Sequence, residues 1–180
     1  MKRALLAGAA LLAMGLPLGA QITLFEQPAL ITSAGQSADV QIASVQARKA
    51  GLQTVLVKAA GPTDLAAAKT LILVFGASLK GLGAAGLDVE KEKGRIKALL
   101  DGAKTKGVPI LALHLGGEAR RGDLTDEMVA AYLPFARMAI VVKSGNKDGL
   151  FTRICRDKNI PLKEIDKTLD LVEPLKQAFK

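Results

Sequence analysis

Apolar runs alternate with Gly-rich loops and amphipathic stretches along most of this chain. Two apolar runs, ALITSAG at 29–35 and TLILVFG at 70–76, are continuous rather than alternating, which is typical of strands buried on both faces of a sheet. Other stretches place their apolar residues on one stripe, as Ile96 and Leu99 do within 88–107, which is typical of an amphipathic helix. The pattern therefore predicts strands and helices in alternation.

The same pattern sets the expected limits of each element, with Gly and Pro marking many boundaries. Strands are expected within 29–35, 52–61, 70–76, 109–117 and 138–146. Helices are expected over 37–51, 88–107, 125–135, 147–159 and 169–179. We expect Ser37 and Thr125 to be the N-caps of their helices, because a hydroxyl can accept from a free N–H group of the first turn.

Alternating strands and helices predict a parallel sheet with helices on both faces. The link at 62–69 between the second and third strands is too short for a full crossover helix. That feature is shared by flavodoxin-like and glutaminase-like sheets, and it favours strand order 2-1-3-4-5 with the switch point between strands 1 and 3. We expect a single three-layer α/β domain, Rossmann-like or flavodoxin-like, with a mostly parallel five-stranded sheet and 160–166 as a candidate short sixth edge strand.

The first twenty residues follow a different pattern. A basic start at Lys2 and Arg3 precedes the apolar run ALLAGAALLAMGLPL, and the small residues Gly19 and Ala20 follow it. This order is typical of a secretory signal peptide, and the run is shorter than the ~20 residues that a membrane helix needs. We expect 1–20 to be a signal peptide, 21–180 to be the mature domain, and its location to be periplasmic or secreted. An uncleaved anchor is the alternative.

Composition narrows the range of partners. Removal of Lys2 and Arg3 lowers the formal net charge of +8 to about +6, which suits an anionic partner. Nucleic acid fits poorly, because the chain has no Trp and one Tyr on which bases could stack. Cys155 is the only cysteine and His114 the only histidine, so no internal disulfide can form and a zinc site of nitrogen and sulfur ligands cannot be built. Cys155 is expected to be a buried thiol.

Four Gly-rich loops follow the expected strands, at 33–39, 76–86, 116–123 and 143–149. Ligands in such sheets bind outside the carboxyl ends of the strands, and three of these loops carry Lys or Arg. Glycine allows close approach of main-chain N–H groups, so the loops predict an anion site, although each could be only a tight turn. The expected ligand-binding residues are Ser33, Gly35, Gln36, Ser37, Ser78, Lys80, Gly81, Gly83, Gly116, Gly117, Arg120, Arg121, Ser144, Asn146 and Lys147.

The stretch GLGAAG at 81–86 matches the letters of a dinucleotide-binding loop. That motif opens a helix directly after the first strand, whereas here Gly76 ends the third strand and four residues intervene before Gly81. We therefore expect no dinucleotide and no other cofactor. The segment is expected to be a mobile loop that brings Ser78 and Lys80 over the switch point.

Candidates for catalysis are few. His114 lies near the carboxyl end of the fourth strand, and Glu118, four residues on, could pair with it for proton transfer. A packed, hydrogen-bonded His114 is the alternative. Ser78 lies in G-x-S-x-K rather than in a nucleophile elbow, and no Walker motif occurs.

Four stretches, ITSAGQSADVQIASV, GASLKGLGAAGLD, LHLGGEARRG and KSGNKDGLFTRI, resemble an uncharacterised bacterial exported family that is known as a domain of unknown function. The resemblance covers essentially the mature chain. It implies an exported single-domain protein and no particular activity.

Three functions are compatible with these residues. We favour the binding of a small anionic metabolite by the Gly-rich basic loops, with a membrane-protein partner or another subunit as a candidate to close the site. The first alternative is a hydrolase or transferase that acts on an anionic substrate through His114 and Glu118. The second is a protein-interaction module, which should show an exposed apolar patch.

Overall fold

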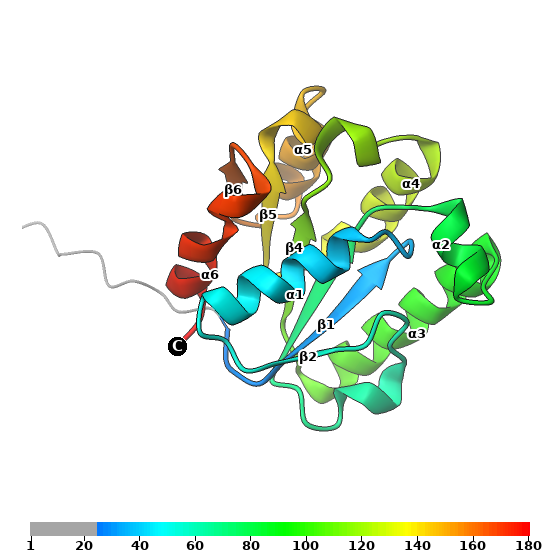
Figure 1. Cartoon of the computed structure of the whole chain (residues 1–180), viewed down its shortest axis with the longest axis horizontal. Helices are drawn as coiled ribbons and strands as arrows, with labels where there is room; N and C mark the ends of the chain where they lie inside the picture. The colour runs from blue at the N-terminus through cyan, green and yellow to red at the C-terminus, as the bar shows by residue number, and fades with distance from the viewer. Residues whose placement is uncertain (1–24) are drawn as a thin grey trace, which may run out of the picture.

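The computed structural model describes residues 25–180, in which a six-stranded parallel sheet forms the middle layer (Figure 1). Its strands are β1 (Ala29–Ala34), β2 (Thr54–Leu56), β3 (Thr70–Phe75), β4 (Ile110–His114), β5 (Met138–Val142) and β6 (Leu162–Ile165). The sheet order is β2-β1-β3-β4-β5-β6, with every neighbouring pair parallel. The predicted order is therefore confirmed, and the candidate edge strand is β6.

In the described part of the chain, six α-helices accompany the sheet: α1 (Asp39–Lys49), α2 (Leu79–Ala84), α3 (Val89–Lys106), α4 (Asp123–Tyr132), α5 (Leu150–Asp157) and α6 (Val172–Ala178). A short 3-10 segment, Pro62–Leu65, stands between β2 and β3 in place of a crossover helix. Helix α2 corrects the prediction of a mobile loop over 76–86. Ser78 caps this helix, because its hydroxyl oxygen accepts a hydrogen bond from the main-chain N–H of Gly81 at 3.1 Å.

The helices cover both faces of the sheet (Figure 1). Successive strand residues point to opposite faces, so each strand contributes to two apolar cores. The core shared with α1 and α6 includes Ile31, Val40, Ala43, Ile72, Val74, Leu113 and Leu175. The core shared with α3, α4 and α5 includes Leu30, Leu71, Phe75, Leu99, Val129, Phe151 and Cys155. Cys155 is buried as expected, and burial raises the pKa of its thiol to about 11.

Two predicted helix caps are wrong. The N-cap of α1 is Ala38, one residue after Ser37. The Ser37 hydroxyl oxygen accepts from the main-chain N–H of Asp39 at 3.2 Å. The N-cap of α4 is Gly122, so Thr125 lies inside the helix. Its hydroxyl oxygen instead accepts from the main-chain N–H of Ala77 at 2.9 Å, which ties the loop after β3 to α4.

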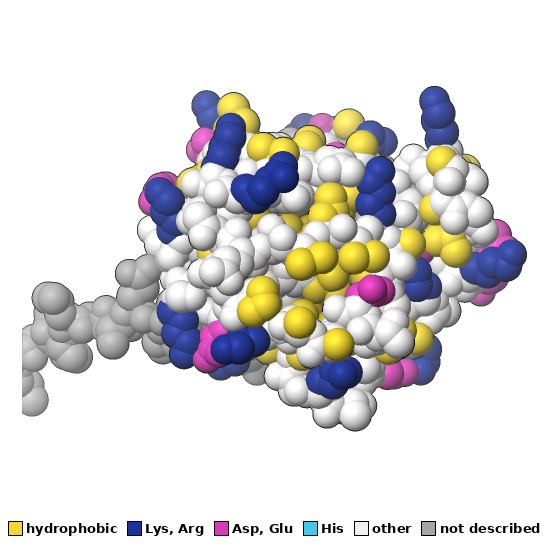
Figure 2. All heavy atoms as spheres, turned by 60° about the horizontal axis from the view of Figure 1, so that its bottom comes forward, with side chains coloured by type: hydrophobic (Ala, Val, Ile, Leu, Met, Phe, Trp, Pro, Cys, Tyr) yellow, Lys and Arg dark blue, Asp and Glu magenta, His cyan; other side chains and the backbone are white. Residues whose placement is uncertain are grey.

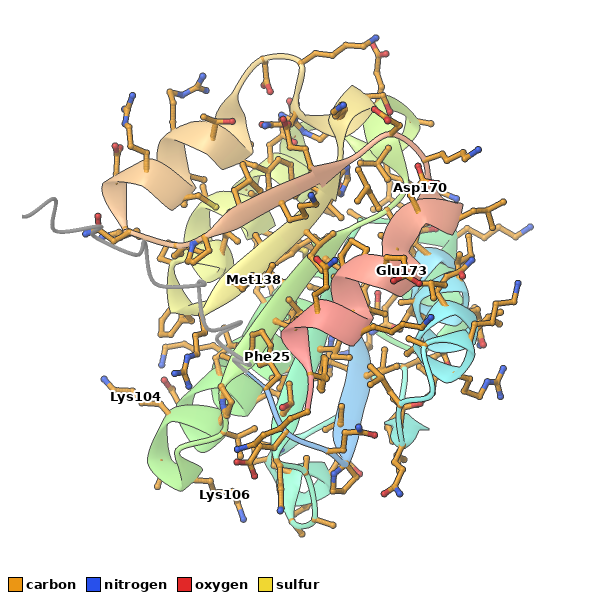
Figure 3. All side chains as sticks on the ribbon, turned by 90° about the vertical axis from the view of Figure 1, so that its left-hand side faces the viewer. Phe25, Lys104, Lys106, Met138, Asp170 and Glu173 are labelled. Carbon is orange, nitrogen blue, oxygen red and sulfur yellow. The ribbon has the colours of Figure 1, made fainter. Side chains whose placement is uncertain are left out.

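The two ends of the described chain meet beside α6. The rings of Phe25 and Phe179 have centroids 5.4 Å apart, and the N–H of Phe25 donates to the carbonyl oxygen of Ala178 at 3.1 Å (Figure 3). The predicted signal peptide, 1–20, lies outside the described residues. Within 25–180, none of the helices has both the length and the apolar character needed to cross a membrane.

The connections diverge at β1 and β3. The chain leaves β1 toward the edge strand β2 and leaves β3 toward β4 on the other side, so the loops after these two strands separate at the carboxyl edge. The first turn of α1 and helix α2 lie at the arrowhead end of β1 (Figure 1). This switch point is where an open parallel sheet offers a binding crevice.

Candidate functional site

A pocket of about 400 Å³ lies at the switch point. We call it the switch-point pocket. Its lining residues are Gln36, Ser37, Ala38, Lys58, Ala59, Ser78, Lys80, Gly81, Ala84, Ala85 and Arg120. Six of them, from three different loops, were expected from the sequence to bind a ligand. The carboxyl ends of β1, β2 and β3 and the loop after β4 therefore converge on one hollow.

The charge around this pocket is positive. Within 25–180, the ammonium groups of Lys58 and Lys80 have neither an ion-pair nor a hydrogen-bond partner. Arg120 is the third cation, and its Nε atom lies 3.7 Å from Oδ2 of Asp39. Lys58 was missed in the sequence analysis, although it follows β2 and the strand-end rule that found the other loops could have found it too.

A buried ion pair holds the loop after β1 in place. Glu92 on α3 is fully buried, and its carboxylate accepts hydrogen bonds from Arg95 at 2.7 and 2.8 Å. The same carboxylate accepts from the N–H of Gly35 at 2.9 Å and from the Gln36 amide at 3.2 Å. The Gln36 amide nitrogen thus points toward Glu92, which holds the loop after β1 in place. The local sequence around Glu92 gives no sign that this acid is buried.

Arg95 extends this anchor to the neighbouring strand ends. Its guanidinium donates to the carbonyl oxygens of Ala60 and Ser33, at 2.8 and 2.5 Å. Ser33 itself is fully buried in β1, its hydroxyl has no hydrogen-bond partner among the described residues, and it does not line the pocket. Helix α3 therefore holds the strand ends and loops that form the pocket, although none of its residues lines the pocket.

Close packing at Gly81 sets the position of α2. A Cβ atom at Gly81 would lie 2.1 Å from the carbonyl oxygen of Gln36, whereas a Cβ atom at Gly83 would meet nothing within 4 Å. Gly81 is therefore required by the approach of α2 to the loop after β1, and Gly83 is not. Because Gly83 also does not line the pocket, the expectation that it binds ligand lacks support from the geometry.

Arg120 and Arg121, adjacent in sequence, are held very differently. Arg121 hydrogen-bonds to both carboxylate oxygens of Asp126, at 2.6 and 2.9 Å, and of Asp148, at 3.0 and 2.8 Å. It also donates to the carbonyl oxygen of Gly145. These bonds raise the pKa of Arg121 and hold the pKa of Asp148 below its usual range. Arg121 therefore ties loops together and has little capacity left for a ligand.

The predicted proton-transfer pair does not form. His114 is fully buried, with Nδ1 3.2 Å from the carbonyl oxygen of Phe75 and Nε2 3.1 Å from that of Gly117. Its ring stacks on Phe151 with centroids 5.1 Å apart, and burial lowers its pKa. Glu118 is exposed and forms an ion pair with Lys147 at 2.5 Å. His114 is thus the packed histidine of the alternative reading.

The remaining expected residues belong to the loops after β4 and β5 and do not line the switch-point pocket. They are Gly116, Gly117, Ser144, Asn146 and Lys147. The N-cap of α5 is Gly149, and Asn146 contacts the first turn of this helix, because its Oδ1 accepts from the N–H of Phe151 at 3.0 Å. The Asn146 amide also donates to Glu164 at 2.8 Å. A Cβ atom at Gly117 would lie 2.3 Å from the Ser144 hydroxyl, so this loop pair is closely packed against itself.

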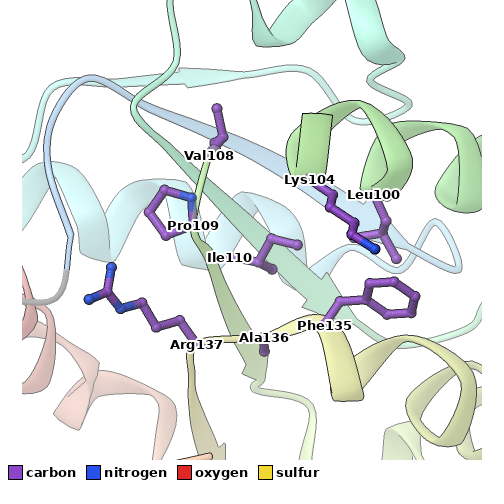
Figure 4. A pocket seen from close by; sticks show the side chains of 8 residues that line it. All are labelled: Leu100, Lys104, Val108, Pro109, Ile110, Phe135, Ala136 and Arg137. Carbon is purple, nitrogen blue, oxygen red and sulfur yellow. The ribbon is translucent and has the colours of Figure 1, made fainter. Parts of the chain in front are cut away.

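A second hollow, of about 380 Å³, lies at the opposite, amino-terminal edge of the sheet (Figure 4). It is lined by Leu100, Lys104, Val108, Pro109, Ile110, Phe135, Ala136 and Arg137. The side chains of Lys104 and Arg137 supply positive charge there, but no Ser, Thr, Asn, Gln or acidic side chain lines it. Apart from these two cations, the described residues that line it supply no polar side chain to orient a ligand.

Hydrophobic side chains gather in the middle of the face shown in Figure 2, which is the bottom of the molecule as drawn in Figure 1. An apolar hollow of about 240 Å³ lies beside the edge strand β2, lined by Pro28, Ala29, Leu30, Val55, Val57, Asp64, Ala66, Ala67 and Ala68. Val55 is 59% exposed. This face matches the exposed patch expected of an interaction module.

Similar solved structures are distant. A protein from Desulfitobacterium hafniense DCB-2, described as lipolytic and of the G-D-S-L family, is 12% identical, with 76% of this chain and 75% of that chain covered and a TM-score of 0.34. The SGNH-hydrolase family esterase AlinE4 is 11% identical, with 80% and 77% covered and a TM-score of 0.30. These scores carry no argument about activity. No curated protein sequence is detectably similar to the chain.

The family comparison is more direct. A family model described as a domain of unknown function (DUF6305) matches residues 26–179, which is almost the whole described chain. The match confirms the resemblance to an uncharacterised family that the loop sequences indicated, while export stays a prediction. By this match over most of its length, the chain belongs to the DUF6305 family.

Proposed function

We propose that this chain is an exported protein that binds a small anionic molecule in the switch-point pocket. The observation that carries the proposal is the gathering of Lys58, Lys80 and Arg120 around one hollow. Cations of the neighbouring loops, such as Arg121 and Lys147, are instead paired with carboxylates. Lys58 and Lys80 have no ion-pair partner within 25–180, and such cations attract anions, more strongly in a partly enclosed site.

The shape and lining of the pocket support a small ligand. A volume of about 400 Å³ lies at the lower end of the range typical of small-molecule sites. The N-cap of α1, Ala38, borders the pocket, and the N–H groups at the start of a helix carry partial positive charge. Ala59, Ala84 and Ala85 offer apolar contact to a short carbon skeleton. A compact carboxylate or phosphate ester suits this combination.

A thermal-shift screen of the purified protein against carboxylates, phosphorylated metabolites and nucleosides is the first test. A ligand present at a hundred times its Kd should stabilise the fold by ~2.7 kcal/mol. We expect stabilisation by anions and none by the uncharged nucleosides. Stabilisation by nucleosides alone would contradict the proposal.

The second test uses the lysines of the pocket. The double variant Lys58→Ala/Lys80→Ala should weaken binding of the best anion by about ten- to a hundredfold, because two charge-assisted contacts are lost. The matched control is Lys104→Ala/Lys106→Ala, which removes two exposed lysines at the far end of α3 (Figure 3). The control should bind as the wild-type protein does. An equal loss of anion affinity in both double variants would mean that net charge alone sets the affinity, which would contradict a specific site at Lys58 and Lys80.

The interaction module is kept as a second candidate because of the apolar hollow beside β2. Val55→Lys places a charge on its exposed edge and should not change anion affinity. If the protein self-associates through this face, the variant should be monomeric where the wild-type protein is not, as measured by sedimentation. An unchanged sedimentation profile would remove support for self-association at β2.

A further inference from the structure

One buried carboxylate oxygen beside the switch-point pocket accepts no hydrogen bond from residues 25–180. Asp39, the first residue of α1, is 6% exposed, and its Oδ2 atom has no hydrogen-bond partner among the described residues. The nearest cation is Nε of Arg120, at 3.7 Å, which is beyond hydrogen-bond length. Burial of a carboxylate oxygen without a donor is costly, and such groups in native proteins call for an explanation.

The start of a helix explains only part of this placement. A negative side chain in the first turn interacts favourably with the helix dipole, whether it is exposed or buried. At the start of α3, Asp88 remains exposed and accepts from the N–H of Lys91 at 2.7 Å. Asp39 neither caps its helix nor stays in solvent. Its inward position therefore needs a second reason.

The surrounding main chain leaves room for the carboxylate. A Cβ atom at Gly76, after β3, would lie 3.3 Å from Oδ2 of Asp39, and a Cβ atom at Gly116, after β4, would lie 2.5 Å from it. Glycines in these two loops thus let the carboxylate stand between the strand ends. The acceptor lies at the carboxyl edge of the sheet, where ligands of such folds bind.

Arg120 separates this acceptor from the pocket. Its Cγ atom lies only 1.9 Å from the position that a Cβ of Gly116 would take, so the side chain crosses the crevice beside Asp39. The side chain also lines the switch-point pocket, is 39% exposed and makes no hydrogen bond to the described residues. A guanidinium held this loosely is free to turn toward an anion in the pocket, which would uncover Asp39.

We propose that Asp39 accepts a hydrogen bond from the ligand, and that the ligand therefore carries a hydroxyl or ammonium donor next to its anionic group. This inference rests on the proposed function and narrows it to small hydroxy acids and amino acids. The anionic group meets Lys58, Lys80 and Arg120, while the donor meets Asp39. Anions without a donor leave Asp39 unsatisfied and meet its negative charge at close range.

Succinate, malate and aspartate test the inference, because they share one carbon skeleton and two carboxylates and differ by a hydrogen, a hydroxyl or an ammonium group. Calorimetric titration of the wild-type protein should give malate and aspartate at least about tenfold tighter binding than succinate. In Asp39→Asn the preference for aspartate should fall at least about tenfold, since the charge-assisted bond is lost, and that for malate should fall less. The same variant should bind succinate more tightly than the wild-type protein does.

Asp123→Asn is the matched control, because Asp123 is the first residue of α4 and is exposed. It should leave all three affinities unchanged. Equal binding of the three probes, or an unchanged preference in Asp39→Asn, would overturn the inference and leave the proposed function standing. If none of the probes and no inorganic phosphate binds, both proposals fall. Should Asp39→Asn not fold, the order of the three affinities in the wild-type protein decides.

Discussion

The loops after β1, β2 and β3 and the loops after β4 and β5 have similar sequences but different structures. Both groups are rich in glycine and carry cations. In the second group Arg121 pairs with Asp126 and Asp148, and Lys147 pairs with Glu118. Arg120 is the exception, since it follows β4 but lines the switch-point pocket. In the first group Lys58 and Lys80 have no such partners within 25–180.

The difference shows that positive charge in a loop does not by itself mark a binding site. What distinguishes the switch-point pocket, within 25–180, is that its lysines have no ion-pair partner and line a hollow that can admit a ligand. The loops after β4 and β5 use the same residue types to tie helices to the sheet.

The largest expected effect is the loss of stability when the Glu92–Arg95 ion pair beside the pocket is broken. Glu92→Ala leaves Arg95 buried without its partner and should lower the free energy of unfolding by about 3–5 kcal/mol. It should also abolish anion binding, because the loop after β1 loses its attachment. Glu90→Ala, an exposed position on the same helix, should change stability by less than about 0.5 kcal/mol. Urea unfolding measures both, and equal effects would contradict the anchor.

Substitution of the first two glycines of GLGAAG by alanine should change the stability of the protein in opposite directions. Gly81→Ala forces a methyl group into the carbonyl oxygen of Gln36 and should destabilise the protein by about 1–3 kcal/mol. Gly83→Ala enters open space in α2 and should stabilise the protein by up to about 1 kcal/mol, through helix propensity. Thermal unfolding of the two variants checks this. A loss of stability of equal size in both would show that α2 does not pack as described.

Substitution of Arg121 should affect mainly the stability of the fold, and substitution of Arg120 should affect mainly anion binding. Arg121→Ala breaks the contacts to Asp126 and Asp148 and should cost about 1.5–3 kcal/mol of stability, with anion affinity unchanged. Arg120→Ala removes a side chain that makes no hydrogen bond within 25–180, so it should cost less stability than Arg121→Ala and should weaken binding of succinate roughly tenfold. Unfolding and calorimetry on both variants test the separation. Weaker succinate binding in Arg121→Ala than in Arg120→Ala would reverse the assignment.

The smallest effect is a dependence on pH. Hydrogen bonds from Arg121 lower the pKa of Asp148 in the folded protein below its unfolded value, so the pair stabilises the fold above that unfolded value of about 4. This contribution is lost as the pH falls through the folded-state pKa. The stability difference between wild-type protein and Arg121→Ala should therefore shrink as the pH is lowered below about 4. A difference that stays constant down to pH 2 would contradict the pairing.

The sheet could be predicted because its strands leave a strong local signal. Continuous apolar runs marked β1 and β3, and the short link between β2 and β3 fixed the strand order, since it excludes a crossover helix. The strand-end rule then brought Ser37, Ser78, Lys80 and Arg120 together correctly. These inferences need only the chain direction and the parallel sheet.

Other features depend on contacts between distant segments. Two glycines within Leu79–Ala84 favoured a loop, and the Ser78 cap and packing against Gln36 outweighed them. Glu92 and Arg95, three residues apart, looked like an exposed helix pair, and only the position of α3 under β1 buries them. The different roles of Arg120 and Arg121 follow from Asp126 and Asp148, whose positions local sequence does not give.

The central claim is that anions bind at the switch point and not at the other Gly-rich loops. Nuclear magnetic resonance of ¹⁵N-labelled protein titrated with succinate, whose charged groups are carboxylates alone, tests it most directly. We predict chemical-shift changes concentrated at the main-chain N–H groups of Ala38, Lys80 and Gly81, with those of Gly117 and Gly145 unchanged. Changes concentrated instead at Gly117, Gly145 and the loop after β5 would contradict the account.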